Sequence, residues 1–333
     1  MKKIYLFIIA TVIGSSWSFS QDFHLSQYDA ASLNTNPAMT GAFDGSFRIH
    51  GHYRTQWAAL VSRPFQTALL AADFNLPKNF AIGIQLADFN AGTAGYNVLA
   101  GSVSLSYNIF LSKNKFHQLR FGVQPGFFQK RINRDHLTWG SQYVPTASGG
   151  TFDTGISSGE TFADQQMFNF DLNAGFLYTY SNPGSRINPF VGLTVFHLNA
   201  PNESFFANKE NRLPFRYLAH LGVRIGINEK YSIIPKIYYT HQKAANEMTF
   251  SLDNQFYLST PDLYLLAGIT YRSKDALIIG VGAKYAGFTF RFSYDTNLSS
   301  LTSVSNGRGA TELSLTYVFK KPKSNPVETC PRL

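Results

Sequence analysis

The sequence predicts an all-β fold, a transmembrane antiparallel β-barrel of about 14 strands with both termini in the periplasm. Period-two alternation of apolar and polar residues recurs from residue 46 to residue 319. Many of the alternating stretches exceed the roughly five or six residues that are usual in soluble strands, and they reach the length of about nine to eleven that crosses a bilayer at a tilt. The connections between them alternate between short and long, as they do in outer-membrane barrels.

The first twenty residues predict export. Lys2 and Lys3 form a positive n-region, the apolar run Ile4–Gly14 follows, and small residues precede a cleavage site near Ser20/Gln21. A buried N-terminal helix is the alternative interpretation. No later segment has the roughly 18 continuous apolar residues of a transmembrane helix. The mature chain is therefore soluble or a barrel.

Composition favours the barrel. Aromatic residues make up 15% of the chain, and charged residues also make up only 15%, against about 25% in typical soluble domains. Mean hydropathy is nevertheless -0.12, so apolar and polar residues must be interleaved. The net charge of +9 would suit nucleic acid or an anionic surface, and the predicted compartment argues against nucleic acid. The single cysteine, Cys330, has no partner for an internal disulfide, and an intermolecular bond or a modification remains open.

Basic residues gather on one face of the predicted strands. Because a charged side chain facing lipid costs about 2–4 kcal/mol at the bilayer midplane, these residues must point into the lumen. The predicted basic lumen residues are Arg48, His50, His52, Arg54, Arg120, Arg216, His220, Arg224, Lys236, Lys284 and Arg291. The acids on this face are Asp73, Asp171, Asp295 and Glu312. We therefore expect a solvated, mainly basic wall, which is either a structural network that cross-links the lumen or a passage or dock for anionic groups.

The connections predict how the strands are joined. Short polar turns are expected at the periplasmic end, at Asn75–Asn79, Ser112–Lys115, Asn182–Arg186, Asn228–Lys230, Ser259–Asp262 and Ala286–Gly287. The outer connections are expected at Gln56–Phe65, Phe89–Ala94, Asn133–Gln166, Ala200–Leu213, Lys243–Asn246, Arg272–Asp275 and Thr296–Gly309. Arg272–Asp275 is tight for an outer loop, so one strand pair could be miscounted.

Four regions follow from this organisation: a signal peptide (1–20), an N-terminal segment (21–45), the barrel (46–319) and a C-terminal periplasmic tail (320–333). The segment 21–45 does not alternate, and Asn34, Asn36–Pro37 and Gly41 are turn residues. It could enter the barrel as a plug or lie along its periplasmic base. The connection Asn133–Gln166, rich in Gly, Ser and Thr, has the length of a functional or mobile loop.

Catalytic motifs are missing from the sequence. It has no Gly-x-Ser-x-Gly elbow, phosphate loop or His-Glu-x-x-His helix. His50 and His52 share a strand face, but no Cys cluster or carboxylate lies near them in sequence to complete a metal site. Gly280 and Gly282 lie within a strand pattern and lack the helix of a nucleotide fingerprint. We therefore expect no enzyme activity, cofactor or metal.

Motifs at both ends of the chain resemble those of the PorP/SprF family of the type IX secretion system of Bacteroidota. The N-terminal motifs are His24-Leu25-Ser26-Gln27-Tyr28, Asn36-Pro37-Ala38, Thr40-Gly41 and Tyr53-Arg54-Thr55-Gln56-Trp57. The C-terminal motifs are Ser293-Tyr294-Asp295, Asn297, Ser299, Glu312-Leu313-Ser314-Leu315-Thr316-Tyr317 and Cys330-Pro331-Arg332. Together they span the mature chain.

The resemblance implies a non-enzymatic outer-membrane component that supports export or surface attachment of adhesin-type cargo, including gliding adhesins, by binding the cargo's C-terminal signal domain. It also implies partners among the periplasmic and outer-membrane type IX components, contacted through Gln21–Phe43 and Lys320–Leu333. The alternative is an outer-membrane channel for small anionic or hydrophobic solutes. The candidate lumen or periplasmic-end residues are Asn36, Pro37, Arg48, His50, His52, Arg54, Gln56, Trp57, Arg216, His220, Arg224, Arg291 and Asp295.

Overall fold

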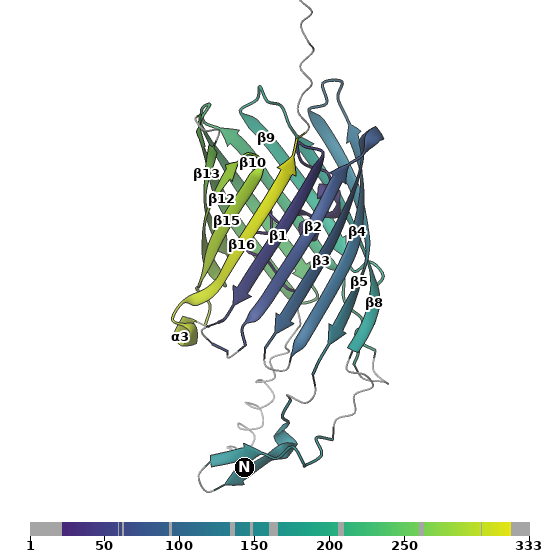
Figure 1. The fold of residues 1–333 in the computed structure, drawn as a ribbon, viewed down its shortest axis with the longest axis vertical. Helices are drawn as coiled ribbons and strands as arrows, with labels where there is room; N and C mark the ends of the chain where they lie inside the picture. Colours follow the sequence, from purple (N-terminus) through teal and green to yellow (C-terminus); the bar gives the residue numbers. More distant parts are fainter. Residues whose placement is uncertain are drawn as a thin grey trace, which may run out of the picture.

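The structure is a computed structural model that describes residues 22–320, apart from 59, 62, 93–94, 134–136, 147–148, 160–165, 206–209, 260–262 and 301. Its main feature is a closed barrel of antiparallel strands (Figure 1). The barrel strands are β1 (Phe47–Gln56), β2 (Phe65–Asn75), β3 (Phe80–Ala91), β4 (Tyr96–Phe110), β5 (His117–Arg131), β8 (Gln166–Tyr180), β9 (Ile187–Phe196), β10 (Arg216–Gly226), β11 (Tyr231–Gln242), β12 (Ala245–Leu258), β13 (Leu263–Arg272), β14 (Ala276–Tyr285), β15 (Phe288–Asn297) and β16 (Arg308–Phe319).

Pairing of the first strand with the last closes the barrel. β1 pairs with β16 from Phe47↔Phe319 to Gln56↔Ala310, and every other barrel strand pairs with its neighbours in sequence. The connection from β5 to β8 carries a separate hairpin, β6 (Tyr143–Thr146) with β7 (Gly149–Phe152). The prediction of about 14 antiparallel strands is confirmed.

The predicted connections lie between these strands. The short turns gather at the end of the barrel where β1 begins and β16 ends, which is the upper end in Figure 1. The longer connections, with α3 (Thr302–Ser305) and the β6–β7 hairpin, lie at the other end, together with the tight turns that follow β11 and β13. Arg272–Asp275 is a true turn between β13 and β14, so no strand pair was miscounted. By the rule for outer-membrane barrels the short-turn end is periplasmic, and we call the opposite end the outer end.

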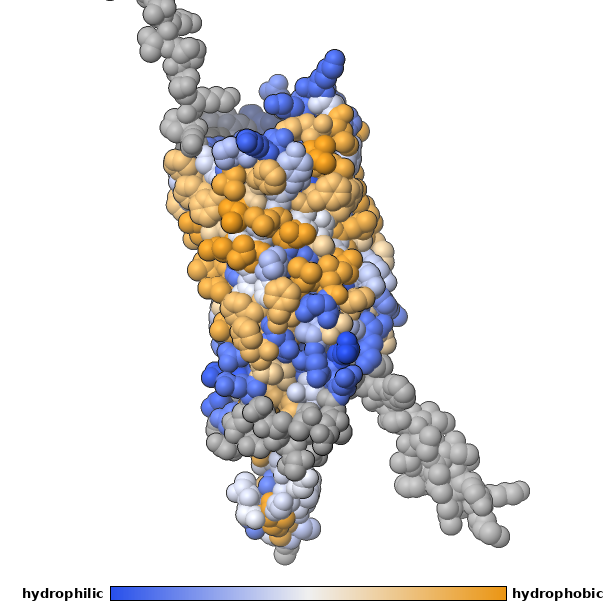
Figure 2. Space-filling model, turned by 90° about the vertical axis from the view of Figure 1, so that its right-hand side faces the viewer, coloured by the Kyte–Doolittle hydropathy of each residue, from blue (hydrophilic) through white to orange (hydrophobic). Residues whose placement is uncertain are grey.

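The barrel wall has an apolar outside and a polar inside. Along β2, Leu70 is 58% exposed and faces outward, whereas Thr67 and Asp73 are buried and face the lumen. Figure 2 shows apolar residues covering the middle of the outer surface, with hydrophilic residues towards both ends. No helix in the described part of the chain is long and apolar enough to span a membrane.

Residues 22–45, here called the luminal segment, run through the lumen from the outer end to the periplasmic end, where they join β1. Their two short helices are α2 (Ser32–Thr35) and η1 (Pro37–Met39). Asn36 starts η1, because its side chain accepts a hydrogen bond from the Ala38 N–H at 2.8 Å and Pro37 suits the first helical turn. Of the two placements left open by the sequence, the structure shows the one inside the barrel. The predicted signal peptide (1–20) and residues 321–333 of the tail lie outside the described residues.

Candidate functional site in the barrel lumen

A buried carboxylate holds the outer half of the luminal segment. Glu312 of β16 is 0% exposed and accepts hydrogen bonds from the backbone N–H groups of Ser26 at 2.6 Å and Gln27 at 2.8 Å. Its other partners are the guanidinium of Arg54 and the ring of His52, at 3.1 Å. A carboxylate offers acceptors only, so the four groups around it can all act as donors to it.

A second carboxylate extends this cluster. Asp295 of β15 accepts a hydrogen bond from the Ser26 hydroxyl at 2.6 Å and from the Arg272 guanidinium at 2.8 Å, and Arg54 lies 3.2 Å away. Arg272 also bonds to Asp275 at 2.6 Å. We call Ser26, Gln27, His52, Arg54, Arg272, Asp295 and Glu312 the ionic cluster. Its buried charges are paired, so removing one partner would leave another charge without compensation.

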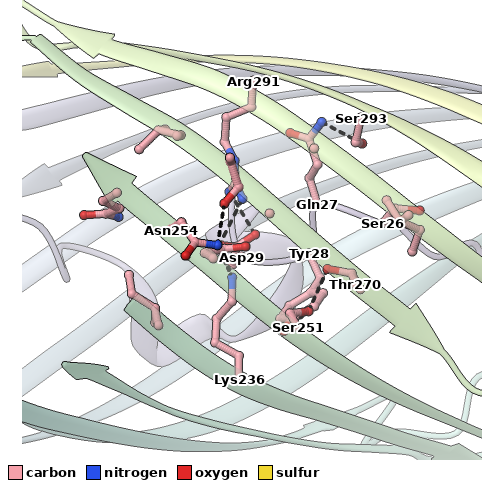
Figure 3. A pocket seen from close by; sticks show the side chains of 18 of the residues that line it. Ser26, Gln27, Tyr28, Asp29, Lys236, Ser251, Asn254, Thr270, Arg291 and Ser293 are labelled. Atoms are coloured by element: carbon pink, nitrogen blue, oxygen red, sulfur yellow. Dashed lines mark hydrogen bonds and ion pairs between the residues drawn. The ribbon is translucent and has the colours of Figure 1, made fainter. Parts of the chain in front are cut away.

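The middle of the luminal segment is held by a second set of ion pairs. Asp29 receives bonds from Lys236 at 2.6 Å and Arg291 at 2.9 Å, and both bases also lie against Asp253. Figure 3 shows Asp29 between the two basic side chains, which come from opposite sides of the pocket. Two acids and two bases cancel, so this pocket carries no net charge from these four groups.

Close backbone packing fixes the helical part of the segment. The Asn36 amide donates to the Phe176 carbonyl at 2.9 Å and lies 3.2 Å from the His220 ring nitrogen. A Cβ at Gly122 would lie 2.3 Å from the Pro37 carbonyl carbon, and one at Gly175 would lie 2.0 Å from the Asn36 side chain. Glycine at these two wall positions is required for the segment to approach so closely.

Apolar contacts complete the packing of the segment against the wall. Leu25, Ala31 and Leu33 form one buried cluster with Leu69, Ala71 and Ala87 of strands β2 and β3. On the opposite side of the lumen the Tyr28 ring lies 4.5 Å from that of Tyr238. The luminal segment therefore contacts walls on both sides of the lumen.

At the periplasmic end the segment is bound through its backbone. Asp73 accepts a hydrogen bond from the Gly41 N–H at 2.7 Å and two from Arg48, at 2.8 and 2.9 Å. The Thr40 carbonyl accepts from Ser106 at 2.7 Å and from Arg120 at 3.4 Å. These bonds hold the last turn of the segment against the barrel wall just before the chain joins β1.

At the outer end an ion network holds Asp22. Its carboxylate lies 2.8 Å from the His197 ring and 3.4 Å from Arg216, and Asp171 binds the other ring nitrogen of His197 at 2.9 Å. Burial alone would lower the pKa of His197, but the Asp22 and Asp171 carboxylates outweigh burial and raise the pKa to about 9. His197 is therefore protonated at neutral pH and carries the positive charge of this network.

Cavities remain on both sides of the segment. On the periplasmic side, one of about 350 Å³ surrounds Asp29 (Figure 3), and one of about 620 Å³ opens near Arg224. On the outer side, one of about 400 Å³ is lined mainly by aromatic and small apolar residues around Phe23, and one of about 350 Å³ lies beside Gln56 and Trp57. The cavities of the two sides share no lining residue.

The predicted site residues all belong to the lumen or its two mouths, but they do not form one site. Asn36, Pro37, Arg48, Arg54, Arg216, His220, Arg291 and Asp295 contact the luminal segment or are part of it. His50 bonds to Thr316 at 2.8 Å, and His52 belongs to the ionic cluster. Gln56 and Trp57 line the cavity at the outer mouth, away from the periplasmic end. Arg224 is exposed at the periplasmic mouth.

The expected solvated basic wall is wrong, because the luminal segment and β12 supply acids that were not counted. Asp22 and Asp29 come from the segment, and Glu247 and Asp253 come from β12. Six of the eleven predicted bases form ion pairs with acids of the described residues, which favours the structural-network interpretation over a passage for anions. These six are Arg48, His52, Arg54, Arg216, Lys236 and Arg291. Within the described ranges, no group of three or more His, Cys, Asp or Glu is placed to hold a metal ion.

Several residues of the ionic cluster were not among the predicted site residues. Arg272 was assigned to a turn, although it continues the lumen face of β13 two residues after Thr270. Ser26 and Gln27 carry part of the family resemblance, but they belong to no strand. Both their backbone N–H groups and their side chains bond to the barrel wall, and a sequence pattern does not show this. The period-two alternation of β13 was the signal that could have identified Arg272.

Solved structures similar to this one are barrels of low sequence identity. The toluene transporter TbuX of Ralstonia pickettii matches 87% of this chain and 94% of its own, at 11% identity and a TM-score of 0.50. The CymD monoaromatic hydrocarbon channel matches 91% of this chain and 95% of its own, at 11% identity and a TM-score of 0.51. These similarities show the fold alone. No curated protein matches the chain.

Sequence comparison identifies the family. Residues 18–317 match the family described as type IX secretion system membrane protein PorP/SprF. The match covers the luminal segment and nearly the whole barrel, including all seven residues of the ionic cluster. The chain belongs to the PorP/SprF family of type IX secretion membrane proteins.

Proposed function

We propose that this chain is a non-enzymatic outer-membrane component of the type IX secretion system that supports export or surface attachment of adhesin-type cargo by binding the cargo's C-terminal signal domain. The family match over residues 18–317 is the observation that carries the proposal. The barrel adds a fitting geometry, since its longer connections gather at one end and offer a surface to a partner outside the cell. Export through a signal peptide cut near Ser20/Gln21 belongs to the same proposal.

The luminal segment supports a docking role over free diffusion through the pore. It crosses the lumen from Asp22 to Gly41, is anchored at the outer end, the middle and the periplasmic end, and separates the cavities of the two sides. This placement also changes the proposed contact with periplasmic partners. Most of Gln21–Phe43 is enclosed by the wall, so the short turns and the tail beyond Lys320 are the better candidates for that contact.

The experiment is affinity purification of the tagged native protein in mild detergent, followed by mass spectrometry. Recovery of a large adhesin with its C-terminal domain is the expected result. A deletion strain should retain that adhesin inside the cell. If deletion leaves secretion of every adhesin-type cargo unchanged, the proposed function is wrong.

A solute channel is the second candidate, and the outer cavity favours it. That cavity of about 400 Å³ is lined by aromatic side chains, including Phe89, Tyr96, Phe128 and Phe196, and two similar barrels are named as a toluene transporter and a monoaromatic hydrocarbon channel. A hydrophobic solute would suit this lining better than an anion, because the three bases among the described residues of this cavity, Lys130, His197 and Arg216, are each paired with an acid. Conductance or solute uptake by the unaltered protein in reconstituted bilayers would support this candidate.

A further inference from the structure

Strand β8 has an edge at the outer end of the barrel with which no strand of the described residues pairs. β8 pairs with β5 along its whole length, from Gln166 to Tyr180, but its pairing with β9 covers only Ala174–Thr179. β9 ends at Phe196, and the chain then turns away through His197, whose φ is +62°. Figure 1 shows β5 and β8 continuing together towards the end with the long connections. The first part of β8 therefore has one strand neighbour where the rest has two.

Bonds near the end of β9 show which backbone groups point to this edge. The Leu198 N–H donates to the Leu172 carbonyl at 2.8 Å. The Asn199 carboxamide accepts from the Leu172 N–H at 3.1 Å and donates to the Phe170 carbonyl at 2.7 Å. The Asn199 carboxamide thus makes the two hydrogen bonds to β8 that a peptide group of a neighbouring strand would make. Because backbone groups alternate in direction along a strand, those of Phe168 and Gln166 point to the same edge.

Beyond Asn199 the edge lacks partners among the described residues. No described residue pairs with the Phe170 N–H, or with the N–H and carbonyl of Phe168, on this side of β8. The two side chains are 55% and 68% exposed and share the outward face. Phe168 stacks on Phe127 of β5 at 5.3 Å, so the exposed aromatic surface is ordered by the strand pair. Another strand would pair with these backbone groups.

We propose that the edge Gln166–Phe170 binds an extended strand of the exported cargo by strand addition at the outer end of the barrel. This inference rests on the proposed function and names the surface and the mode of cargo binding. The occupant is a segment of about four or five residues with alternating side chains. Its apolar residues lie beside Phe168 and Phe170, and its polar residues lie on the face of Asn169. The backbone of this cargo segment pairs with β8 beyond the point where the Asn199 side chain makes the last bonds to that strand.

Two substitutions at one position separate backbone pairing from side-chain contact. Phe168→Pro removes the N–H at the open edge, and the β5 pairing is kept because this residue's backbone points away from β5. Phe168→Ala keeps the N–H and removes the ring. We expect cargo recovered with the purified protein to fall roughly five- to tenfold in the Pro variant, which is the effect of losing one hydrogen bond and leaving its acceptor unpaired. The Ala variant should lose less. Equal recovery from the Pro variant and the unaltered protein, both folded, overturns the proposal.

Photo-crosslinking tests the same surface with the backbone intact. The photoreactive analogue p-benzoylphenylalanine replaces Phe170, and a matched control places it at Phe292, an outward-facing residue of β15. A covalent adduct with cargo at position 170 and none at 292 is expected. An adduct with a second copy of this chain, with lipid alone, or with no protein overturns the proposal. If deletion of the whole chain abolishes secretion while neither edge experiment shows an effect, the strand-addition mode fails and the proposed function stands.

Discussion

Replacing Glu312 by glutamine should loosen the luminal segment without changing the shape of the side chain. All four groups around this carboxylate are positioned to donate: the backbone N–H groups of Ser26 and Gln27, the Arg54 guanidinium and the His52 ring. A glutamine side chain offers one acceptor oxygen and an NH₂ group. At least one donor would therefore face another donor, and the charge opposite Arg54 would be lost.

The expected magnitude follows from burial. Both partners of this ion pair are buried, with side chains 0% and 2% exposed, so solvent screening is weak. Breaking one side of a buried pair costs about 3–5 kcal/mol, which shifts the equilibrium between the bound and the released segment by a factor of roughly 150–5,000. Other anchors, such as the Asp29 ion pairs, remain. We therefore expect intermittent opening and no permanent loss of the segment.

The assay is single-channel recording in planar bilayers. The unaltered protein should be closed nearly all the time, deletion of residues 22–41 should give a constantly open pore, and Glu312→Gln should open in bursts. Glu229→Gln, the same change at an exposed turn carboxylate, is the matched control and should behave like the unaltered protein. If Glu312→Gln stays closed while the deletion conducts, the ionic cluster does not hold the segment. If the deletion does not conduct either, the segment is not what closes the lumen.

Three further predictions concern other anchors of the segment. Asn36→Ala loses the carboxamide bonds beside His220 and should lower the stability of the folded barrel by roughly 1–3 kcal/mol, measured by heat-dependent mobility in gels. Gly122→Val places a side chain 2.3 Å from the segment's backbone and should expel the segment or prevent folding, whereas Gly51→Ala, with nothing within 4 Å, should be silent in the same assay. The pKa of His197 in the folded protein is raised to about 9. Its contribution to the stability of the barrel is therefore complete below about pH 6.5 and is lost as pH rises through 9. His197→Gln should abolish this alkaline loss of stability in melting curves.

The barrel itself was predictable because its physical constraint acts on every residue of every strand. A side chain of the wall faces either lipid or lumen, so alternation such as Phe47, Ile49 and Tyr53 against His50 and His52 records the two faces directly. Turns are marked by residues that tolerate the left-handed region, such as Gly287 at φ +86°. Strand count and connection lengths follow from these local signals.

The interior of the lumen was not predictable in the same way. The luminal segment has no periodicity, and its position depends on bonds to residues far away in sequence: Ser26 and Glu312 are separated by 286 positions. The prediction overestimated the basic character of the lumen for two reasons. Asp22 and Asp29 belong to no strand, and Asp253 of β12 was not counted although it lies in a strand. Periodicity shows which way a side chain points and not what occupies the space in front of it.

The family resemblance acquires a physical explanation from this arrangement. The motif around Ser26 and Gln27 and the motifs around Asp295 and Glu312 lie at opposite ends of the chain, yet they meet in the ionic cluster, with Arg54 between them. Arg54 and Glu312 face each other across the β1–β16 ladder that closes the barrel, whereas Ser26 and Gln27 belong to no strand and take no part in that ladder. What they specify together is a segment held inside the barrel. The bonds of Ser26 and Gln27 to Glu312 are therefore explained by an occupied lumen and not by closure of the barrel, and a secretion component whose pore must not leak would have that requirement.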